Sequence, residues 1–287
     1  MTSILDQTLR QIFSRQKSRG TSENVRYRPG PVLSDAVFVL STGRAGTKTL
    51  AALGGLDARL YARHEPQPLL FALSKSAYAN IHVNKNLDIF KSAYWTARID
   101  LFYTALQTQK RYFETSPQST FLGPVIADLM PKAKFIHLTR NPLSVIRSGM
   151  RRKWYSGNLL DSTRIEPLID SPSYGKWQSW SPFEKNIWLW KETNQWIHDF
   201  LSGLPPERSQ IVQAENIFNN HQSSISAFYE FLGVTTPAGK KIKKVLARSL
   251  NAQTTRTFPF PDKWSEEMLD SARNILGDSA NNLGYRI

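Results

Sequence analysis

The chain contains no cysteine among its 287 residues. This absence excludes disulfides, thiolate nucleophiles, iron–sulfur clusters and cysteine-based zinc sites. It fits a reducing compartment, and we expect a cytoplasmic protein. No apolar run approaches the roughly 20 residues that a membrane-spanning helix needs. The first 13 residues lack the positive start and the long apolar stretch of a secretory signal, so we expect neither such a signal nor integral membrane association. Their apolar residues fall at helical spacing, which predicts a short helix packed on the domain, with a membrane-surface helix or a transit peptide as the alternative.

Acidic residues are scarce relative to basic ones. The sequence has 23 Asp and Glu against 37 Lys and Arg, which gives a formal net charge of +14 and a pI of about 10.0. This imbalance leaves three classes of partner open: nucleic acid, an anionic membrane surface or a polyanionic small ligand. Because 40% of the residues are hydrophobic and 11% are aromatic, general disorder is excluded.

Short β-rich runs alternate with helical stretches along most of the chain. The first run, DAVFVL (35–40), is typical of a strand buried on both faces. Further strands are predicted at 58–62, 111–115, 134–138 and 209–214, with helices between them, notably at 88–107, 124–130 and 182–201. This alternation predicts an α/β fold with a mainly parallel, doubly wound sheet and helices on both faces. We expect residues 1–34 to be a helical and linker extension, and residues 35–287 to form a single domain.

A glycine-rich turn, STGRAGTKT (41–49), separates the first predicted strand from a short apolar helix. At such a junction, unpaired backbone N–H groups and the positive end of the helix dipole point at one place. Gly43 and Gly46 allow the backbone to approach an anion closely, while Arg44 and Lys48 add positive charge. The turn predicts a phosphate or sulfate site in a P-loop-like nucleotide-binding fold, and a tight turn without a ligand is the alternative.

The turn departs from the Walker A loop of kinases and ATPases, in which glycine directly precedes the lysine. Thr47 stands in that place, and Gly43 and Lys48 are five residues apart rather than six. Magnesium-nucleotide chemistry also needs an Asp at the end of a neighbouring strand, whereas the strand KFIHLT (134–139) is followed by Arg140. A P-loop kinase using ATP and Mg²⁺ therefore stays only as an alternative. A nucleic-acid-binding protein is the other alternative, and charge is its only support.

A second basic motif, LTRNPLSVIRSGM (138–150), contains Arg140 at the carboxyl end of a predicted strand, where open α/β sheets bind ligands. Ser148 follows eight residues later, near enough on the next predicted helix to share a phosphate with Arg140. With the glycine turn, this motif resembles the sulfotransferases that use 3′-phosphoadenosine 5′-phosphosulfate (PAPS). The segment SQIVQAENIF (209–218) resembles that family's later strand and acidic loop. The Lys-Thr-His motif of the cytosolic aryl and steroid branch is absent, since the matching region reads FETSP (113–117).

The resemblance implies transfer of a sulfuryl group from PAPS to a hydroxyl, or alternatively a nitrogen, of a small-molecule or saccharide acceptor. The transfer would be in line and without a metal ion, with adenosine 3′,5′-bisphosphate as the product and no nucleic acid as partner. The residues implied for the 5′-phosphosulfate are Arg44, Ala45, Gly46, Thr47, Lys48 and Thr49. Arg140 and Ser148 are implied for the 3′-phosphate. Arg44 and Lys48 are also the implied catalytic cations, because charge develops on the bridging oxygen of the departing nucleotide.

An acceptor hydroxyl also needs a base. RHEP (63–66) follows the second predicted strand, where several carbohydrate and tyrosine sulfotransferases carry a catalytic glutamate. By position, Glu65 is the first candidate and His64 the second, with a role in orienting loops as the alternative for both. Glu114, near the end of the third predicted strand, is a third candidate.

Three further segments are expected around the reactants. The insert 74–110 and the long polar stretch 154–181 are expected to shape the acceptor pocket, the latter as a lid or acceptor-binding loop. In NAQTTRTFPFPDKW (251–264), the resemblance implies that Arg256 or Lys263 closes over the nucleotide, and an ordinary surface loop is the alternative.

The positive charge is concentrated in a few stretches of the sequence. Residues 132–153 contain seven basic side chains and no acid, and residues 239–256 contain six and no acid. Residues 1–30 contribute +4, which leaves −3 for the rest of the chain. Much of the charge therefore lies near the predicted nucleotide, and the remainder favours a neutral or cationic acceptor over a polyanionic polymer.

Overall fold

Five parallel strands form the sheet in the described part of the chain, which comprises residues 33, 35–80, 87–248 and 258–287 of a computed structural model. They are β1 (Val37–Leu40), β2 (Leu60–His64), β3 (Arg111–Thr115), β4 (Lys134–Thr139) and β5 (Ser209–Gln213), in the order β2-β3-β1-β4-β5. Each strand was predicted to within two residues at either end. The predicted extension 1–34 lies outside the described residues except for Leu33, which is buried.

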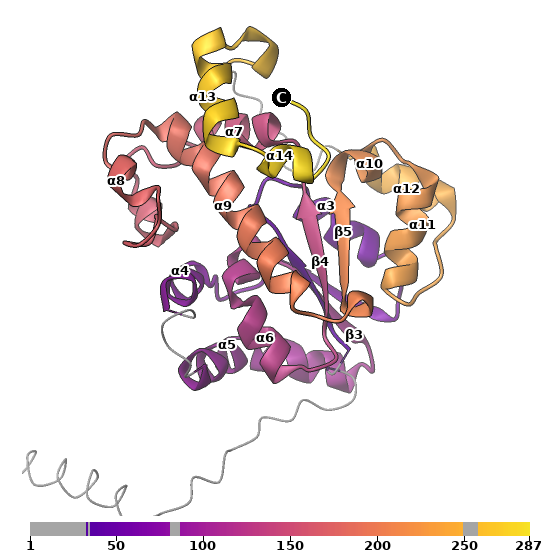
Figure 1. The fold of residues 1–287 in the computed structure, drawn as a ribbon. Helices are drawn as coiled ribbons and strands as arrows, with labels where there is room; N and C mark the ends of the chain where they lie inside the picture. Colours follow the sequence, from indigo (N-terminus) through magenta and orange to yellow (C-terminus); the bar gives the residue numbers. More distant parts are fainter. Residues whose placement is uncertain (1–32, 34, 81–86, 249–257) are drawn as a thin grey trace, which may run out of the picture.

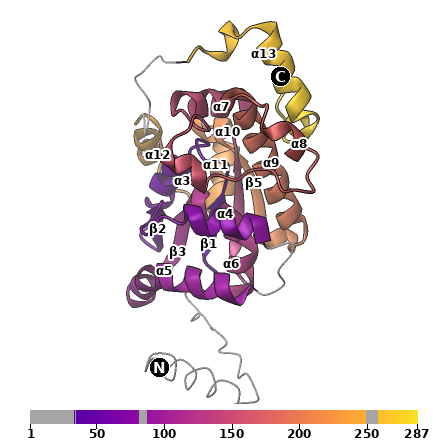
Figure 2. The same cartoon turned by 90° about the vertical axis from the view of Figure 1, so that its left-hand side faces the viewer.

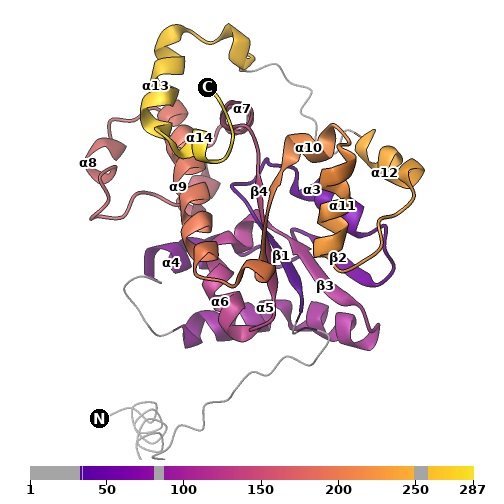
Figure 3. The ribbon, with the colours of Figure 1, turned by 45° about the vertical axis from the view of Figure 1, so that its right-hand side comes forward.

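Alternating side chains divide the core into two layers, one on each face of the sheet. Phe38 and Leu40 of β1 face one layer, and Val37 and Val39 face the other. The first layer is covered by α4 (Phe71–Asn80), α5 (Asp88–Gln107), α6 (Gly123–Leu129) and α9 (Pro182–Ser202). The second is covered by α3 (Thr47–Gly54), α10 (Ala214–Phe218), α11 (Gln222–Phe231) and α12 (Gly239–Leu246) (Figures 1 and 3). The expectation of a parallel α/β sheet with helices on both faces is confirmed.

A third apolar cluster lies beyond the carboxyl ends of the strands. It joins α7 (Pro142–Arg151), η4 (Pro261–Lys263), α13 (Glu266–Leu276) and α14 (Ser279–Asn282) to the first half of α9. Trp264 packs edge-on against Phe183 of α9, with ring centroids 5.1 Å apart. Figure 1 shows α13 and α14 above the ends of β4 and β5. The carboxyl edge of the sheet is thus partly covered, which limits access to the ligand site expected there.

Helix α9 connects these clusters, and its sequence sets its start. Ser181 Oγ accepts a hydrogen bond from the Glu184 N–H at 3.3 Å, and Glu184 accepts one from the Ser181 N–H at 2.8 Å, which is a capping box. Its tryptophans are buried: Trp188 and Trp196 in the first layer and Trp190 in the cluster beyond the strands.

The remaining short elements lie in connections between the larger ones. They are η1 (Pro117–Leu122), η2 (Leu159–Thr163), α8 (Tyr174–Trp177) and η3 (Pro206–Arg208). Figure 2 shows α4 in front of the sheet, with α5 and α6 below it. The stretch 154–181, expected as an irregular loop, contains η2 and α8, and Trp177 of α8 packs edge-on against Trp188.

Candidate functional site

A cavity of about 730 Å³ lies at the carboxyl edge of the sheet. Its lining includes residues that follow or end the strands: Ser41 after β1, His64 at the end of β2, Pro117 after β3 and Arg140 after β4. Open parallel sheets place their ligand sites at this edge because the helices begin there. The structure thus brings the glycine turn and the second basic motif to one cavity.

The glycine turn takes a backbone path that few residue types tolerate. Gly46, which immediately precedes α3, has φ of 104°. A Cβ on Gly46 would lie 2.4 Å from Cζ of Phe218, so only glycine fits. The first turn of α3 carries no acidic side chain and no side-chain cap. Its start therefore keeps the positive end of the helix dipole without a neutralising carboxylate.

The two basic motifs contact each other directly. Arg44 Nε donates a hydrogen bond to Ser148 Oγ at 2.9 Å, and Arg140 Nη1 donates to the Arg44 carbonyl oxygen at 3.0 Å. Asn141 caps α7 by accepting from the Ser144 N–H at 3.2 Å, which fixes the start of the helix that carries Ser148. The motifs are almost one hundred residues apart in sequence but form one unit in space.

Positive charge in the cavity is crowded and poorly balanced. Burial, together with the charges of Arg152 and Arg140, lowers the pKa of the Arg44 guanidinium to about 10, and Glu65 compensates only in part. Burial also lowers the pKa of Arg140, with Glu215 acting in the opposite direction. Such a cluster of cations favours a bound anion, since an anion reduces their mutual repulsion.

His64 and Glu65 both line the cavity. His64 Nδ1 lies 2.9 Å from the Thr115 carbonyl oxygen, which can only accept, so this nitrogen carries the proton. In the neutral ring, Nε2 is then the nitrogen with a lone pair. It lies 4.0 Å from Glu65 Oε1, and 43% of the Glu65 side chain is exposed. Both side chains can therefore accept a proton from a molecule in the cavity.

Glu114, the third candidate base, is wrongly placed for that role. It is 1% exposed, does not line the cavity, and forms a two-hydrogen-bond ion pair with Arg98, at 2.9 and 3.0 Å. Tyr112 and Ser119 donate to the same carboxylate at 2.6 and 2.8 Å. Its oxygens are thus occupied by four donors, and its function is structural. Arg98 also donates to the Pro68 carbonyl oxygen at 2.9 Å, which fixes the turn after Glu65.

Most of the other predicted site residues are at the cavity. Those that line it are Arg44, Gly46, Thr47, Lys48, Thr49, His64, Glu65 and Arg140. Ala45 is buried in the core, and Ser148 is not among the residues that line the cavity but accepts a hydrogen bond from Arg44, which does line it. Lys263 of η4 is exposed and does not line the cavity, and Arg256 lies outside the described residues. Sequence reasoning missed Arg152 and Arg248, although both belong to basic stretches that it singled out.

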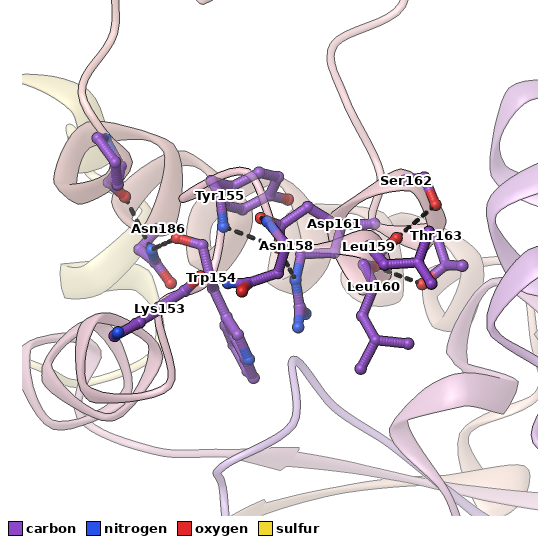
Figure 4. Close-up of polar contacts among 12 residues, drawn as sticks. Lys153, Trp154, Tyr155, Asn158, Leu159, Leu160, Asp161, Ser162, Thr163 and Asn186 are labelled. Carbon is purple, nitrogen blue, oxygen red and sulfur yellow. Dashed lines mark hydrogen bonds and ion pairs between the residues drawn. The ribbon is translucent and has the colours of Figure 1, made fainter.

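The segments expected to shape the acceptor pocket contribute unequally. Only Ser74 and Lys75 of the described part of the insert 74–110 line the cavity, because α5 packs its apolar side chains into the first core layer instead. The stretch 154–181 contributes Trp154, Leu160, Thr163, Arg164 and Ile165. Figure 4 shows Trp154 and Leu160 pointing to the same side of this stretch. Asp161 holds the stretch in place by accepting from the Tyr155 and Asn158 N–H groups at 2.9 and 3.0 Å.

Two absences among the described residues bear on metal ions and membranes. No group of three or more His, Cys, Asp and Glu side chains in this part of the chain is arranged to hold a metal ion. Within the same residues, no helix combines the length and apolar character needed to span a bilayer.

Comparison with known proteins identifies the family. A sequence profile described as "Sulfotransferase family" matches residues 35–238, well over half of the chain. The chain therefore belongs to the sulfotransferase family, which makes it a transferase and supports sulfuryl transfer as its general chemistry. No curated protein matches the sequence. The match gives no support to the kinase or nucleic-acid alternatives.

Solved sulfotransferase structures share the fold at low sequence identity. The sulfotransferase domain from the curacin biosynthetic pathway is 18% identical, with a TM-score of 0.54 over 88% of this chain and 98% of that one. The domain from the olefin synthase of Synechococcus PCC 7002 is 16% identical, with a TM-score of 0.50 over 89% and 98%. Sulfotransferase STF1 from Mycobacterium tuberculosis H37Rv is 12% identical, with a TM-score of 0.50 over 96% and 81%. At these identities the likeness concerns the fold alone.

Proposed function

We propose that this protein transfers a sulfuryl group from PAPS to a hydroxyl group of an acceptor without using a metal ion. The observation that carries the proposal is the convergence of Arg44 and Arg140 on one cavity, with the pKa of each guanidinium lowered by burial. A nucleotide with a phosphosulfate and a second phosphate supplies the anionic groups that this arrangement favours. Sulfotransferases generally use PAPS, so membership in the family supports PAPS as the donor.

The residues of the two motifs divide between the two anionic ends of PAPS. The turn and the start of α3 would hold the 5′-phosphosulfate through Arg44, Lys48 and the Thr47 and Thr49 hydroxyls, all of which line the cavity. Arg140 would hold the 3′-phosphate. Ser148 Oγ accepts a hydrogen bond from Arg44, so its own hydroxyl hydrogen stays available to a phosphate oxygen. Ser148 would thereby orient Arg44 and bind the nucleotide at once.

In the transfer step, the acceptor oxygen forms a bond to sulfur while its proton passes to a base. The bond between sulfur and the bridging oxygen breaks, and its electron pair stays on the 5′-phosphate of adenosine 3′,5′-bisphosphate. Arg44 and Lys48 would stabilise the charge that develops there. Glu65 and His64 Nε2 are the two groups that would take the proton. Both residues line the cavity, and we place Glu65 first because more of its side chain is exposed.

The experiment is a transfer assay with sulfur-labelled PAPS and a panel of acceptor alcohols, phenols and saccharides, in buffer containing a metal chelator. The proposal expects labelled product from the wild-type chain. Glu65→Gln should reduce kcat by about 100- to 10,000-fold if Glu65 is the base, and His64→Gln should do so if His64 is. Gln67→Ala, on an exposed neighbouring residue, is the matched control. Transfer of phosphate from ATP that requires Mg²⁺ would contradict the proposal.

A further inference from the structure

The cavity has a second wall whose chemistry differs from that of the glycine turn. It is formed by α4, η1, α9 and the stretch around η2. Its apolar side chains are Phe71, Phe121, Trp154, Leu160, Ile165 and Leu189. We call these elements and side chains the acceptor wall. Apolar walls with a few placed polar groups are typical of pockets that bind small organic molecules.

Two hydroxyl groups are buried in this wall without a partner. Ser74 of α4 and Thr193 of α9 both line the cavity, at 4% and 2% exposure. Neither Ser74 Oγ nor Thr193 Oγ1 has a hydrogen-bond partner among the described residues. Buried hydroxyls normally find one, and on helices a carbonyl of the preceding turn is the common choice. Both oxygens are covered by neighbouring atoms, so each hydroxyl would turn towards the cavity to bind a polar group of a ligand, and would then gain the partner it lacks.

The two helices that carry these hydroxyls are fixed to each other. Tyr78 of α4, one turn after Ser74, donates a hydrogen bond to Glu192 of α9 at 2.7 Å, and Glu192 directly precedes Thr193. The Phe121 ring of η1 packs edge-on against Tyr78, with centroids 5.0 Å apart. The hydroxyl groups thus belong to a rigid part of the wall, and a ligand group can be held there in a defined position.

Charge on the acceptor wall is balanced, unlike that at the glycine turn. Lys75 pairs with Glu166 at 3.3 Å and also donates to the Ser162 carbonyl oxygen at 3.0 Å. Arg164 pairs with Asp161 at 3.1 Å and lies 4.2 Å from the Trp154 ring centroid. Each of these cations has an acid beside it, so the wall offers little attraction to an anionic polymer.

We propose that the acceptor is an uncharged, mainly apolar alcohol or phenol that carries a second hydrogen-bonding group at its far end. Its apolar body would pack on the acceptor wall, its far end would bind Ser74 and Thr193, and its reacting hydroxyl would lie beside His64 and Glu65. This inference rests on the proposed sulfuryl transfer and names the acceptor class for the same cavity. Saccharides fit poorly, because most of their hydroxyl groups would lose water without gaining partners.

The test uses the full chain and a matched pair of acceptors, 4-(3-hydroxypropyl)phenol and 4-propylphenol, with maltose as the saccharide. With labelled PAPS, kcat/KM should rank the hydroxypropyl compound first and maltose last. Ser74→Ala and Thr193→Val should each raise the KM for the hydroxypropyl compound by about three- to tenfold, with no change for 4-propylphenol. Ser76→Ala, an exposed serine on the same helix, is the control that should change neither.

Several results would overturn the inference. One is a higher kcat/KM for maltose than for either phenol, and another is an equal KM change for both phenols, which would mean a merely structural role for the hydroxyls. Unchanged KM values in both variants would also overturn it. Binding of adenosine 3′,5′-bisphosphate, measured by calorimetry, separates a wrong acceptor class from a wrong donor. If the nucleotide binds and neither phenol is sulfated, the acceptor class is wrong, whereas no nucleotide binding means that the proposed function itself fails.

Discussion

Arg98 and Arg44 are both withdrawn from water, but their surroundings differ. Burial by itself would lower the pKa of Arg98, yet the Glu114 carboxylate outweighs burial through its charge and hydrogen bonds and raises that pKa. Arg44 has the opposite balance, since burial and the charges of Arg152 and Arg140 together lower its pKa to about 10. The comparison teaches that this protein pairs a buried cation with an acid where the pair serves the fold, and crowds cations together where they face the cavity.

His137 shows a third way of burying a basic group. It lies in the middle of β4 at 0% exposure, and its Nε2 is 2.8 Å from Asn194 Oδ1. Burial lowers the pKa of His137 to about 4, so the ring is neutral at physiological pH. A buried basic side chain can thus be paired with an acid, as Arg98 is, or be neutral, as His137 is. In neither case is a net positive charge left for a ligand.

The largest effect is expected from breaking the structural pair. Arg98→Met leaves the Glu114 carboxylate buried with no cation, which should reduce the free energy of unfolding by about 3–5 kcal/mol. Urea unfolding followed by circular dichroism measures the loss. The double variant with Glu114→Leu removes both charges and should recover part of it. A loss below about 1 kcal/mol in the single variant would contradict the assigned structural role.

Arg44→Gln should affect activity and stability in opposite ways. Loss of the cation at the breaking bond should reduce kcat by about 100- to 1,000-fold, or roughly 3–4 kcal/mol. The free energy of unfolding of the ligand-free protein should stay level or rise, because repulsion with Arg140 and Arg152 is removed. Transfer assays and urea unfolding measure the two effects. If Arg44→Gln and Arg98→Met reduce the free energy of unfolding equally, the proposed contrast between the cavity cation and the structural cation is wrong.

Acid should destabilise the protein through His137. Its pKa in the folded state, about 4, is below the 6.5 of the unfolded chain, so the unfolded state binds more protons between these values. The free energy of unfolding should therefore fall by about 3 kcal/mol as the pH drops from 6.5 to 4. Urea unfolding at several pH values measures how steeply the free energy of unfolding depends on pH. His137→Gln should flatten this dependence, and an unchanged slope in this variant would refute the assignment.

The smallest of these effects concerns nucleotide affinity. Arg140→Gln should raise the Kd of adenosine 3′,5′-bisphosphate by about 10- to 100-fold, since a charged hydrogen bond to phosphate contributes roughly 1.5–3 kcal/mol. Arg147→Gln is the matched control, because Arg147 lies on α7 but does not line the cavity. Calorimetry measures both. An equal loss in the two variants would mean that affinity depends only on overall positive charge.

The parts of this fold that could be predicted are those encoded locally in the sequence. Strand β1 is a continuous buried apolar run of the kind expected in a parallel sheet. All five predicted strands are present, although β2 and β5 are only partly buried. Helix α5 was expected at 88–107 and has those limits. The glycine turn and Arg140 were placed at one sheet edge because both follow strands, and the cavity contains both.

The rest depends on packing between segments that are distant in sequence. Nothing in FETSP shows that Glu114 faces Arg98, because that pairing arises only when α5 packs against β3. The bond between Arg44 and Ser148, and the unpartnered hydroxyls of Ser74 and Thr193, likewise follow from how helices approach the sheet edge. Sequence therefore located the charged side of the cavity, whereas its acceptor wall needed the structure.

The central claim is that the cations of the glycine turn, together with Arg140, bind PAPS. The most direct measurement is the thermal unfolding midpoint, Tm, in a chelator-containing buffer with adenosine 3′,5′-bisphosphate, adenosine 5′-monophosphate or, in a parallel sample with Mg²⁺, ATP. At 100 times its Kd, the bisphosphate should stabilise the protein by about 2.7 kcal/mol. Its Tm increase should exceed that of the other two nucleotides and disappear in the Arg44→Gln, Arg140→Gln double variant. No increase with the bisphosphate, or a larger one with ATP and Mg²⁺, would contradict the claim.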